Sequence, residues 1–256
     1  MLGQDVMRAL GERGVGFTHA ELDVTDSAGV REALAGATVI NCAANTDVDG
    51  AEADPSAAQA INVEGARNVA EAAARAIYIS SDYVFDGTKP APYVESDPVN
   101  PISRYGRTKL EGERATLTAS PHSLVVRTAW LFGSGGENFV TTMLALGEER
   151  GEVRVVDDQV GCPTFTGHLA EALVALAEGH EHGFLHVAGA GACSWFEFAR
   201  AIFERAGMDV EARPCTTEEF PRPAPRPANS ALVSERGAPV LPSWQDGLDA
   251  YLGVRA

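Results

Sequence analysis

The chain has 256 residues, of which 45% are apolar and 22% charged, a composition typical of a globular protein with a sizeable core. It carries 20 Lys and Arg against 36 Asp and Glu, a net charge of −16, which argues against nucleic acid as a general partner. No apolar run approaches the ~20 residues that span a bilayer and no signal peptide opens the chain, so no membrane association is expected. The four cysteines are far apart and form no CxxC, which indicates reduced thiols, a cytoplasmic location and no metal site.

Short apolar runs alternate with helical patterns along the first half of the chain. Residues 4–13 predict a helix, and residues 38–44 predict a buried strand that runs into a turn of small residues. Asp54-Pro55 predicts a helix start with Asp54 as N-cap, for a helix that continues to residue 76. Strands are then predicted over 77–80 and 123–127, with a helix over 105–117 between them.

This alternation predicts an α/β fold with a Rossmann-like, doubly wound parallel sheet. After about residue 150 the pattern changes to short elements rich in Gly and Pro, and the proline-rich segment 221–228 is expected to be extended. Two connections are short for this fold. The helix reaches Ile77 without a loop, and residues 14–23 leave little room for a strand. We therefore expect that residues are missing at the start of the chain, near 14–18, and between Ala76 and Ile77.

Tyr105 and Lys109 are the most informative residues of the sequence. Four residues apart on a predicted helix, their side chains share one face about a turn apart. An ammonium beside a phenol favours the charged form and lowers the phenol pKa from its usual value near 10. Such a group exchanges a proton while a hydride moves, so the pair points to a carbonyl–alcohol oxidoreductase.

With these residues in place, the chain resembles the extended short-chain dehydrogenases/reductases, and within them the dTDP-4-dehydrorhamnose reductases. The blocks that carry the resemblance are Asn41–Asp49, Ser80–Gly87, Tyr105–Lys109, Arg127–Gly133, Asp158–Thr164 and Arg226–Ser230. It implies a dinucleotide-binding domain over 1–150, whose first strand and Gly-rich turn are not in the sequence. It also implies a smaller, mainly substrate-binding lobe over 151–256, with segments that return to the first domain.

The resemblance assigns catalytic roles to Tyr105, Lys109 and Ser81. Tyr105 would protonate the C4 oxygen of a dTDP-4-keto-6-deoxyhexose as hydride arrives from NADPH or NADH. Lys109 would bind the nicotinamide ribose and lower the pKa of Tyr105, and Ser81 would hydrogen-bond the substrate carbonyl. The alternatives are a half-buried helix tyrosine beside a solvated lysine, and a serine that caps the next turn.

The resemblance also assigns cofactor-binding residues, in addition to Tyr105 and Lys109. Gly3 matches the last glycine of the fingerprint that brings backbone N–H groups to a pyrophosphate, although a helix start alone would explain it. Asp23 and Val24 would meet the adenine, while Asp23 equally suits a helix cap. Ala43 and Ala44 would lie along the cofactor, or are small only for packing. Nothing in the sequence separates NADPH from NADH.

Further residues are implied to surround the nucleotide sugar. They are Thr46, Val48, Asp82, Trp130, Asn138, Gln159 and Arg226. For three of them a plain structural role competes: Trp130 as a core aromatic, Asn138 as a helix cap, and Arg226 as a solvated arginine. If Arg226 does face the substrate, it supplies the cation that a diphosphate requires.

Related activities remain as alternatives. The 4,6-dehydratases follow their catalytic Thr-Asp with a glutamate, whereas Tyr83 follows Ser81-Asp82 here, which speaks against dehydration. Another 4-ketoreductase, an epimerase, or a non-catalytic regulatory subunit of this fold are the other hypotheses. The sequence decides neither the hexose nor whether the chain forms a homodimer.

Overall fold

The main sheet has four parallel strands in the order β1-β2-β3-β8, as predicted for this fold class. The computed structural model describes residues 1–253. Ile77 lies opposite Ile40 on one side and Leu124 on the other, at the centre of the sheet. The strands are β1 (Thr38–Asn41), β2 (Arg75–Ser81), β3 (Leu124–Thr128) and β8 (Gly183–His186).

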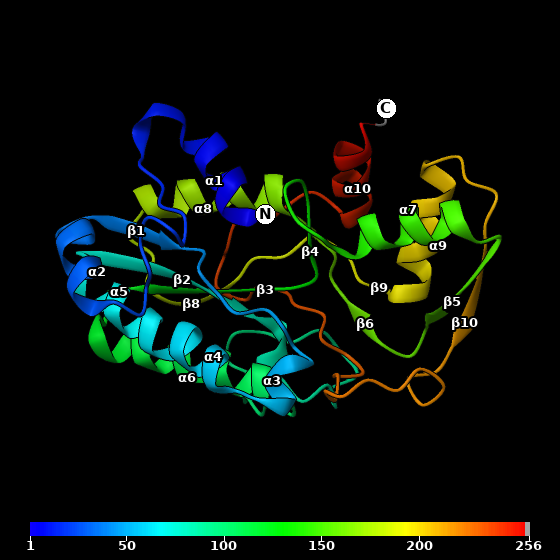
Figure 1. Cartoon of the computed structure of the whole chain (residues 1–256), viewed down its shortest axis with the longest axis horizontal. Helices are drawn as coiled ribbons and strands as arrows, with labels where there is room; N and C mark the ends of the chain where they lie inside the picture. Colours follow the sequence, from blue (N-terminus) through cyan, green and yellow to red (C-terminus); the bar gives the residue numbers. More distant parts are fainter. Residues whose placement is uncertain (254–256) are drawn as a thin grey trace.

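Helices cover both faces of this sheet (Figure 1). Ile77 packs with the helices of one face and its neighbour Tyr78 with those of the other, the two-sided burial of a central parallel strand. The first face carries α1 (Leu2–Leu10), which continues as a 3₁₀ turn (Gly11–Arg13), and α8 (Thr166–Glu178). The second carries α2 (Ser27–Leu34), α5 (Ala66–Ala72) and α6 (Arg104–Ala119).

The chain is continuous at the two connections that the sequence left too short. α5 ends at Ala72, four residues earlier than predicted, and β2 already begins at Arg75. Ala76 and Ile77 are successive residues of that strand, so the expected gap between them was wrong. The strand starts early because the Arg75 guanidinium donates to the carbonyls of Leu176, Ala177 and Gly179 at the end of α8. Residues 14–26 contain no strand at all.

The helical segment before β2 contains a π-helical stretch. Asp54, predicted as an N-cap, accepts a hydrogen bond from Ser56 N at 2.9 Å. The π-helical stretch places Asn62 against two neighbouring elements. Its side-chain amide donates to the Thr108 hydroxyl of α6, and its backbone carbonyl accepts from the Tyr78 hydroxyl of β2. The pieces are α3 (Gly50–Ala53), α4 (Ser56–Gln59), the π-helical stretch (Ala60–Gly65) and α5.

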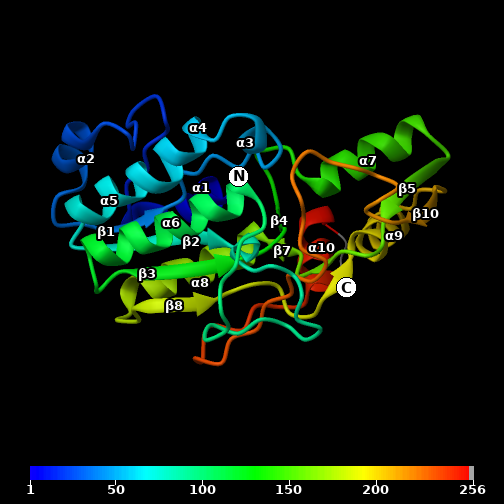
Figure 2. The ribbon, with the colours of Figure 1, turned by 90° about the horizontal axis from the view of Figure 1, so that it is seen from below.

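A second group of elements lies beside the sheet (Figure 2). It has its own core, centred on Phe198 and Ile202, and a parallel strand pair β5-β10. Its elements are α7 (Phe139–Glu149), β5 (Glu152–Val156), α9 (Trp195–Arg205), β10 (Glu211–Cys215) and α10 (Trp244–Leu252). Two short pairs complete it: β4 (Leu131–Phe132) with β7 (Thr164–Phe165), and β6 (Val160–Gly161) with β9 (Cys193–Ser194).

The chain passes from the sheet to this lobe and back. α7 packs in the second core, whereas the following helix α8 packs on the main sheet and β8 is one of its strands. The division of the chain at residue 150 stays a prediction. Within residues 1–253, no helix has the length and apolar character needed to cross a membrane.

A buried ion pair joins α6 to the sheet. Both carboxylate oxygens of Glu113 accept from the Arg127 guanidinium of β3, each at 2.8 Å. Glu113 also accepts from the Ser80 hydroxyl of β2 at 2.6 Å. Glu113 is fully buried and Arg127 is only 3% exposed, so each charge relies on the other in place of water.

We therefore expect Glu113→Gln to destabilise the protein strongly. The substitution leaves the buried Arg127 charge without its counter-ion, a loss of ~3–5 kcal/mol in the free energy of unfolding. Urea denaturation of the variant measures it. Glu64→Gln is the control, because Glu64 pairs with Arg67 on an exposed helix face and such pairs contribute ~1 kcal/mol or less. Equal losses in both variants would contradict the prediction.

Candidate active site

The predicted catalytic residues meet at the carboxyl end of β2. Ser81 is the last residue of that strand, and α6 runs back beneath it (Figure 2). The helix starts at Arg104 because the Ser103 hydroxyl accepts from Gly106 N at 3.1 Å and caps it. Tyr105 therefore lies in the first turn and Lys109 in the next. This edge of a parallel sheet is where doubly wound folds bind their ligands.

Ser81 lies between Tyr105 and a buried carboxyl group. Its hydroxyl donates to Asp82 Oδ1 at 2.9 Å and accepts from Tyr83 N at 3.2 Å, so it also caps the following turn. Burial raises the pKa of Asp82 to about 6, against the hydrogen bonds from Ser230 and Ser81 that lower it. Asp82 Oδ2 is buried and has no hydrogen-bond partner among the described residues.

The pKa of Tyr105 departs from its usual value in the direction opposite to the prediction. Burial raises it to about 12, while the Ser81 hydroxyl lowers it and the Asp82 charge raises it further. Lys109 is not among the causes of the shift. The expected lowering of the phenol pKa by Lys109 was therefore wrong for this structure. A phenol with this pKa is protonated at neutral pH and is a proton donor.

Lys109 is buried under the sheet and points toward β2. Its Nζ donates to the Ile79 carbonyl at 2.7 Å and lies 4.3 Å from the ring centroid of Tyr78. Burial lowers the pKa of Lys109 to about 7, opposed by the negative charge of Glu113 and by Cys42. The ammonium is therefore positioned by a backbone carbonyl, and Glu113 one turn later favours its charged form.

The predicted cofactor residues fall into two groups. Gly3, Ala43 and Ala44 lie together where α1 begins beside the end of β1, and a Cβ on Gly3 would meet Cys42 Cβ at 3.6 Å. A helix N-terminus beside small residues suits the pyrophosphate of a dinucleotide, so these residues fit the implied cofactor. Asp23 accepts from the backbone and hydroxyl of Thr25, whereas Asp26 caps α2. Val24 packs against Gly65 of the π-helical stretch.

Of the predicted sugar-binding residues, Val48 lies against Tyr105, the predicted proton donor. It packs in one cluster with Tyr105 and Tyr83, whose rings meet edge to face at 5.7 Å. Thr46 is exposed two residues earlier in the same loop. Tyr83, on which the prediction against dehydration rests, thus packs against Tyr105, and that prediction stays a prediction.

Trp130 and Asn138 border the second lobe. Trp130 has a φ of 46°, and its ring stacks on Trp195 at 3.4 Å between centroids. The Asn138 side chain caps α7 by accepting from Val140 N and Thr141 N, and its amide donates to Gly133 O. The capping role of Asn138 is thus observed, while a contact of either residue with a ligand stays a prediction.

Gln159 contacts the residues just before the proline-rich segment, and Arg226 lies within that segment. Gln159 is buried and donates to Thr217 Oγ1 at 2.9 Å. Arg226 is not a solvated arginine, because it donates to both oxygens of Asp49, each at 3.0 Å. Arg222 shares the same carboxylate. The sequence analysis missed Asp49 and Arg222 as site residues, since no local pattern links positions 173–177 residues apart.

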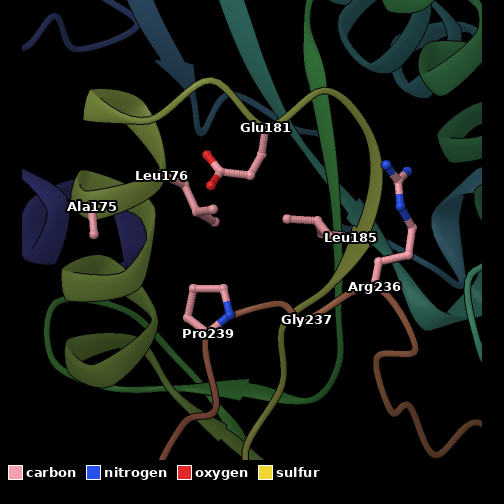
Figure 3. A pocket seen from close by; sticks show the side chains of 7 residues that line it. All are labelled: Ala175, Leu176, Glu181, Leu185, Arg236, Gly237 and Pro239. Atoms are coloured by element: carbon pink, nitrogen blue, oxygen red, sulfur yellow. The ribbon is translucent and has the colours of Figure 1, made fainter.

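A separate pocket of about 240 Å³ lies between the end of α8, the start of β8 and residues 236–239 (Figure 3). Figure 3 shows the Glu181 carboxylate turned toward the apolar side chains and the Arg236 guanidinium turned away from them. Arg236 donates to the Phe184 carbonyl at 3.1 Å. The pocket holds none of the predicted site residues, which follow the other ends of the strands.

Comparisons with known proteins decide the family. A family model described as the RmlD substrate binding domain matches residues 1–255. The chain belongs to this family. It is 45% identical to the dTDP-4-dehydrorhamnose reductase of Mycolicibacterium smegmatis, in an alignment that covers 98% of this chain and 81% of that protein.

Solved structures of the same family superpose closely. A dTDP-4-dehydrorhamnose reductase from Clostridium acetobutylicum gives a TM-score of 0.94 at 40% identity, covering 99% of this chain and 95% of that one. The enzyme from Bacillus anthracis, solved in complex with NADP, gives 0.94 at 38% identity with the same coverage. The predicted family and Rossmann-like fold are confirmed.

The buried Asp82 carboxyl makes the stability of the protein depend on pH. Its folded-state pKa of about 6 is above the unfolded value of about 3.9, so the folded state binds more protons between these values. Stability from this group is present below about pH 4 and is lost as pH rises through about 6, a change of about 3 kcal/mol.

Thermal or urea unfolding of wild type and Asp82→Asn at pH values from about 3 to 7 measures this contribution. The difference in unfolding free energy should shift by about 3 kcal/mol in favour of the variant as pH rises. A difference that is constant across this range would show that Asp82 is not the titrating group.

Proposed function

We propose that this chain catalyses the NADPH- or NADH-dependent reduction of the C4 ketone of a dTDP-4-keto-6-deoxyhexose, converting dTDP-4-dehydrorhamnose to dTDP-L-rhamnose. The observation that carries the proposal is the meeting of Ser81, Tyr105 and Lys109 at one edge of the sheet, in a chain of the RmlD family. Relatives named dTDP-4-dehydrorhamnose reductase and the NADP complex of one of them support it.

Tyr105 is the proton donor in this reaction. A bound nicotinamide supplies the hydride, and the C4 oxygen then develops alkoxide charge. The Ser81 hydroxyl stabilises that charge as a hydrogen-bond donor, and the Tyr105 phenol delivers the proton. The raised pKa of Tyr105 keeps the phenol protonated at neutral pH, so the proton is available for transfer to the C4 oxygen. In this structure the Ser81 hydroxyl donates to Asp82. It therefore turns from Asp82 to the substrate carbonyl when the substrate binds.

The remaining residues hold cofactor and substrate. Lys109 holds the nicotinamide ribose, while Gly3, Ala43 and Ala44 admit the pyrophosphate and Asp23 and Val24 meet the adenine. On the sugar side, Thr46, Val48 and Asp82 belong to the sheet lobe. Trp130, Asn138 and Gln159 approach from the second lobe, and Arg226 from the proline-rich segment that packs on the loop after β2. The proposed enzyme acts in the cytoplasm, and a homodimer is its proposed assembly.

A single-atom substitution tests the catalytic assignment. Tyr105→Phe removes the proposed proton donor and should lower kcat by ~10²-fold or more, with KM for the cofactor little changed. The measurement follows NADPH consumption with dTDP-4-dehydrorhamnose and identifies the sugar product. Tyr251→Phe removes the same atom from α10 in the second lobe and should keep wild-type activity. Undiminished activity of Tyr105→Phe would contradict the assignment.

A further inference from the structure

Asp49 organises the segment 222–226 through a single carboxylate. Its Oδ2 accepts from Arg222 Nε at 3.0 Å, Arg222 Nη2 at 2.5 Å and Arg226 Nη2 at 3.0 Å. Its Oδ1 accepts from Ala224 N at 3.1 Å and Arg226 Nη1 at 3.0 Å. Burial acts to raise the pKa of Asp49, but the hydrogen bonds from Arg226, Ala224 N and Arg222 outweigh it and hold the pKa far below its usual range. The carboxylate is therefore charged at any physiological pH.

These contacts fix which edge of the Arg226 guanidinium is occupied. Arg226 has five N–H donors. Asp49 takes one from Nη1 and one from Nη2, and the Ala224 carbonyl takes the second Nη1 donor at 2.8 Å. Among the described residues, nothing accepts from Nε–H or from the second Nη2–H. These two donors lie parallel on one edge, the arrangement that binds a phosphate group with two hydrogen bonds.

The segment that carries Arg226 is seated beside the catalytic residues. A Cβ on Gly87, whose φ is +82°, would come within 2.6 Å of Ala228 N and Pro227 Cβ, so the segment packs directly on the loop after β2. Asp49 follows Val48, which packs against Tyr105. Two guanidiniums on one carboxylate leave a net charge of +1 at this place, although the chain as a whole carries −16.

We propose that Asp49 is a positioning residue that orients Arg226, so that the Nε/Nη2 edge of the guanidinium receives the diphosphate of the substrate. The proposal rests on the proposed function, from which the sugar nucleotide comes. Asp49 itself does not touch the substrate. Its role is to hold Arg226 and the backbone of residue 224 in one arrangement before the substrate arrives, which removes the cost of ordering a long side chain on binding.

Calorimetric binding of dTDP and of thymidine tests the proposal, because only dTDP has a diphosphate. Asp49→Asn keeps the size of the side chain but not its charge, and should weaken dTDP binding about tenfold or more while thymidine affinity is unchanged. Arg226→Gln should show the same pattern. The double variant should bind dTDP no more weakly than Arg226→Gln alone, since the two residues act as one unit.

Arg226→Lys is a second variant that does not disturb the Asp49 carboxylate. A lysine keeps the charge but cannot bind Asp49 and a phosphate through two separate edges, so dTDP affinity should again fall about tenfold. Unchanged dTDP binding by Asp49→Asn or Arg226→Lys would overturn the proposal. So would an equal loss of thymidine affinity, or effects of the two single variants that multiply in the double variant.

The same experiment separates this proposal from the proposed function. Wild-type protein that binds dTDP but consumes no NADPH with the keto sugar would refute the reductase assignment, and the binding comparisons would still decide the role of Asp49. Wild-type protein that does not bind dTDP at all would refute both.

Discussion

The buried Glu113–Arg127 ion pair is the interaction on which the geometry of the site depends. Glu113 follows Lys109 by one helical turn. Its carboxylate binds Arg127 of β3 and the hydroxyl of Ser80, the residue before Ser81 in β2. Tyr105, the proposed proton donor, and the Ser81 hydroxyl beside it come from different elements. Their relative position is therefore only as fixed as the contact between α6 and the sheet. A fully buried charge pair allows little sliding between these elements, because any displacement would leave a charge without its partner.

The local parts of the site could be predicted from the sequence, and the long-range parts could not. Tyr105 and Lys109 share a helix face because of their spacing, and Ser103 caps that helix, both properties of a few adjacent residues. The pKa of Tyr105 was predicted in the wrong direction because burial, not the neighbouring ammonium, dominates it. Burial is a property of the folded chain. Likewise, Asp49 and Arg226 meet across 177 residues, and no pattern of either segment reveals the other.

The boundary between α5 and β2 shows why the ends of elements are hard to predict. Alanines at 72–74 and 76 continue the helical pattern without interruption. The strand nevertheless begins at Arg75, since that side chain reaches the end of α8 and the backbone pairs with β1. Helix propensity is a weak preference that tertiary contacts override. For the proline-rich segment, the local conformation was predictable and the position was not. Its prolines predict an extended chain, but its contacts with Gly87 and Asp49 form only in the fold.

The π-helical stretch Ala60–Gly65 has a consequence for how this chain can change in evolution. A π turn arises when one residue is inserted into an α-helix, and each residue of an α-helix accounts for about 100° of rotation. Removing one residue here would restore a regular helix and turn Asn62 away from either Thr108 or the loop at Asn45, both of which it now bonds. Asn62 thus links the loop after β1 to α6, the helix that carries Tyr105 and Lys109. Deletions of a single residue in this segment should be far rarer among functional descendants than substitutions at its exposed positions.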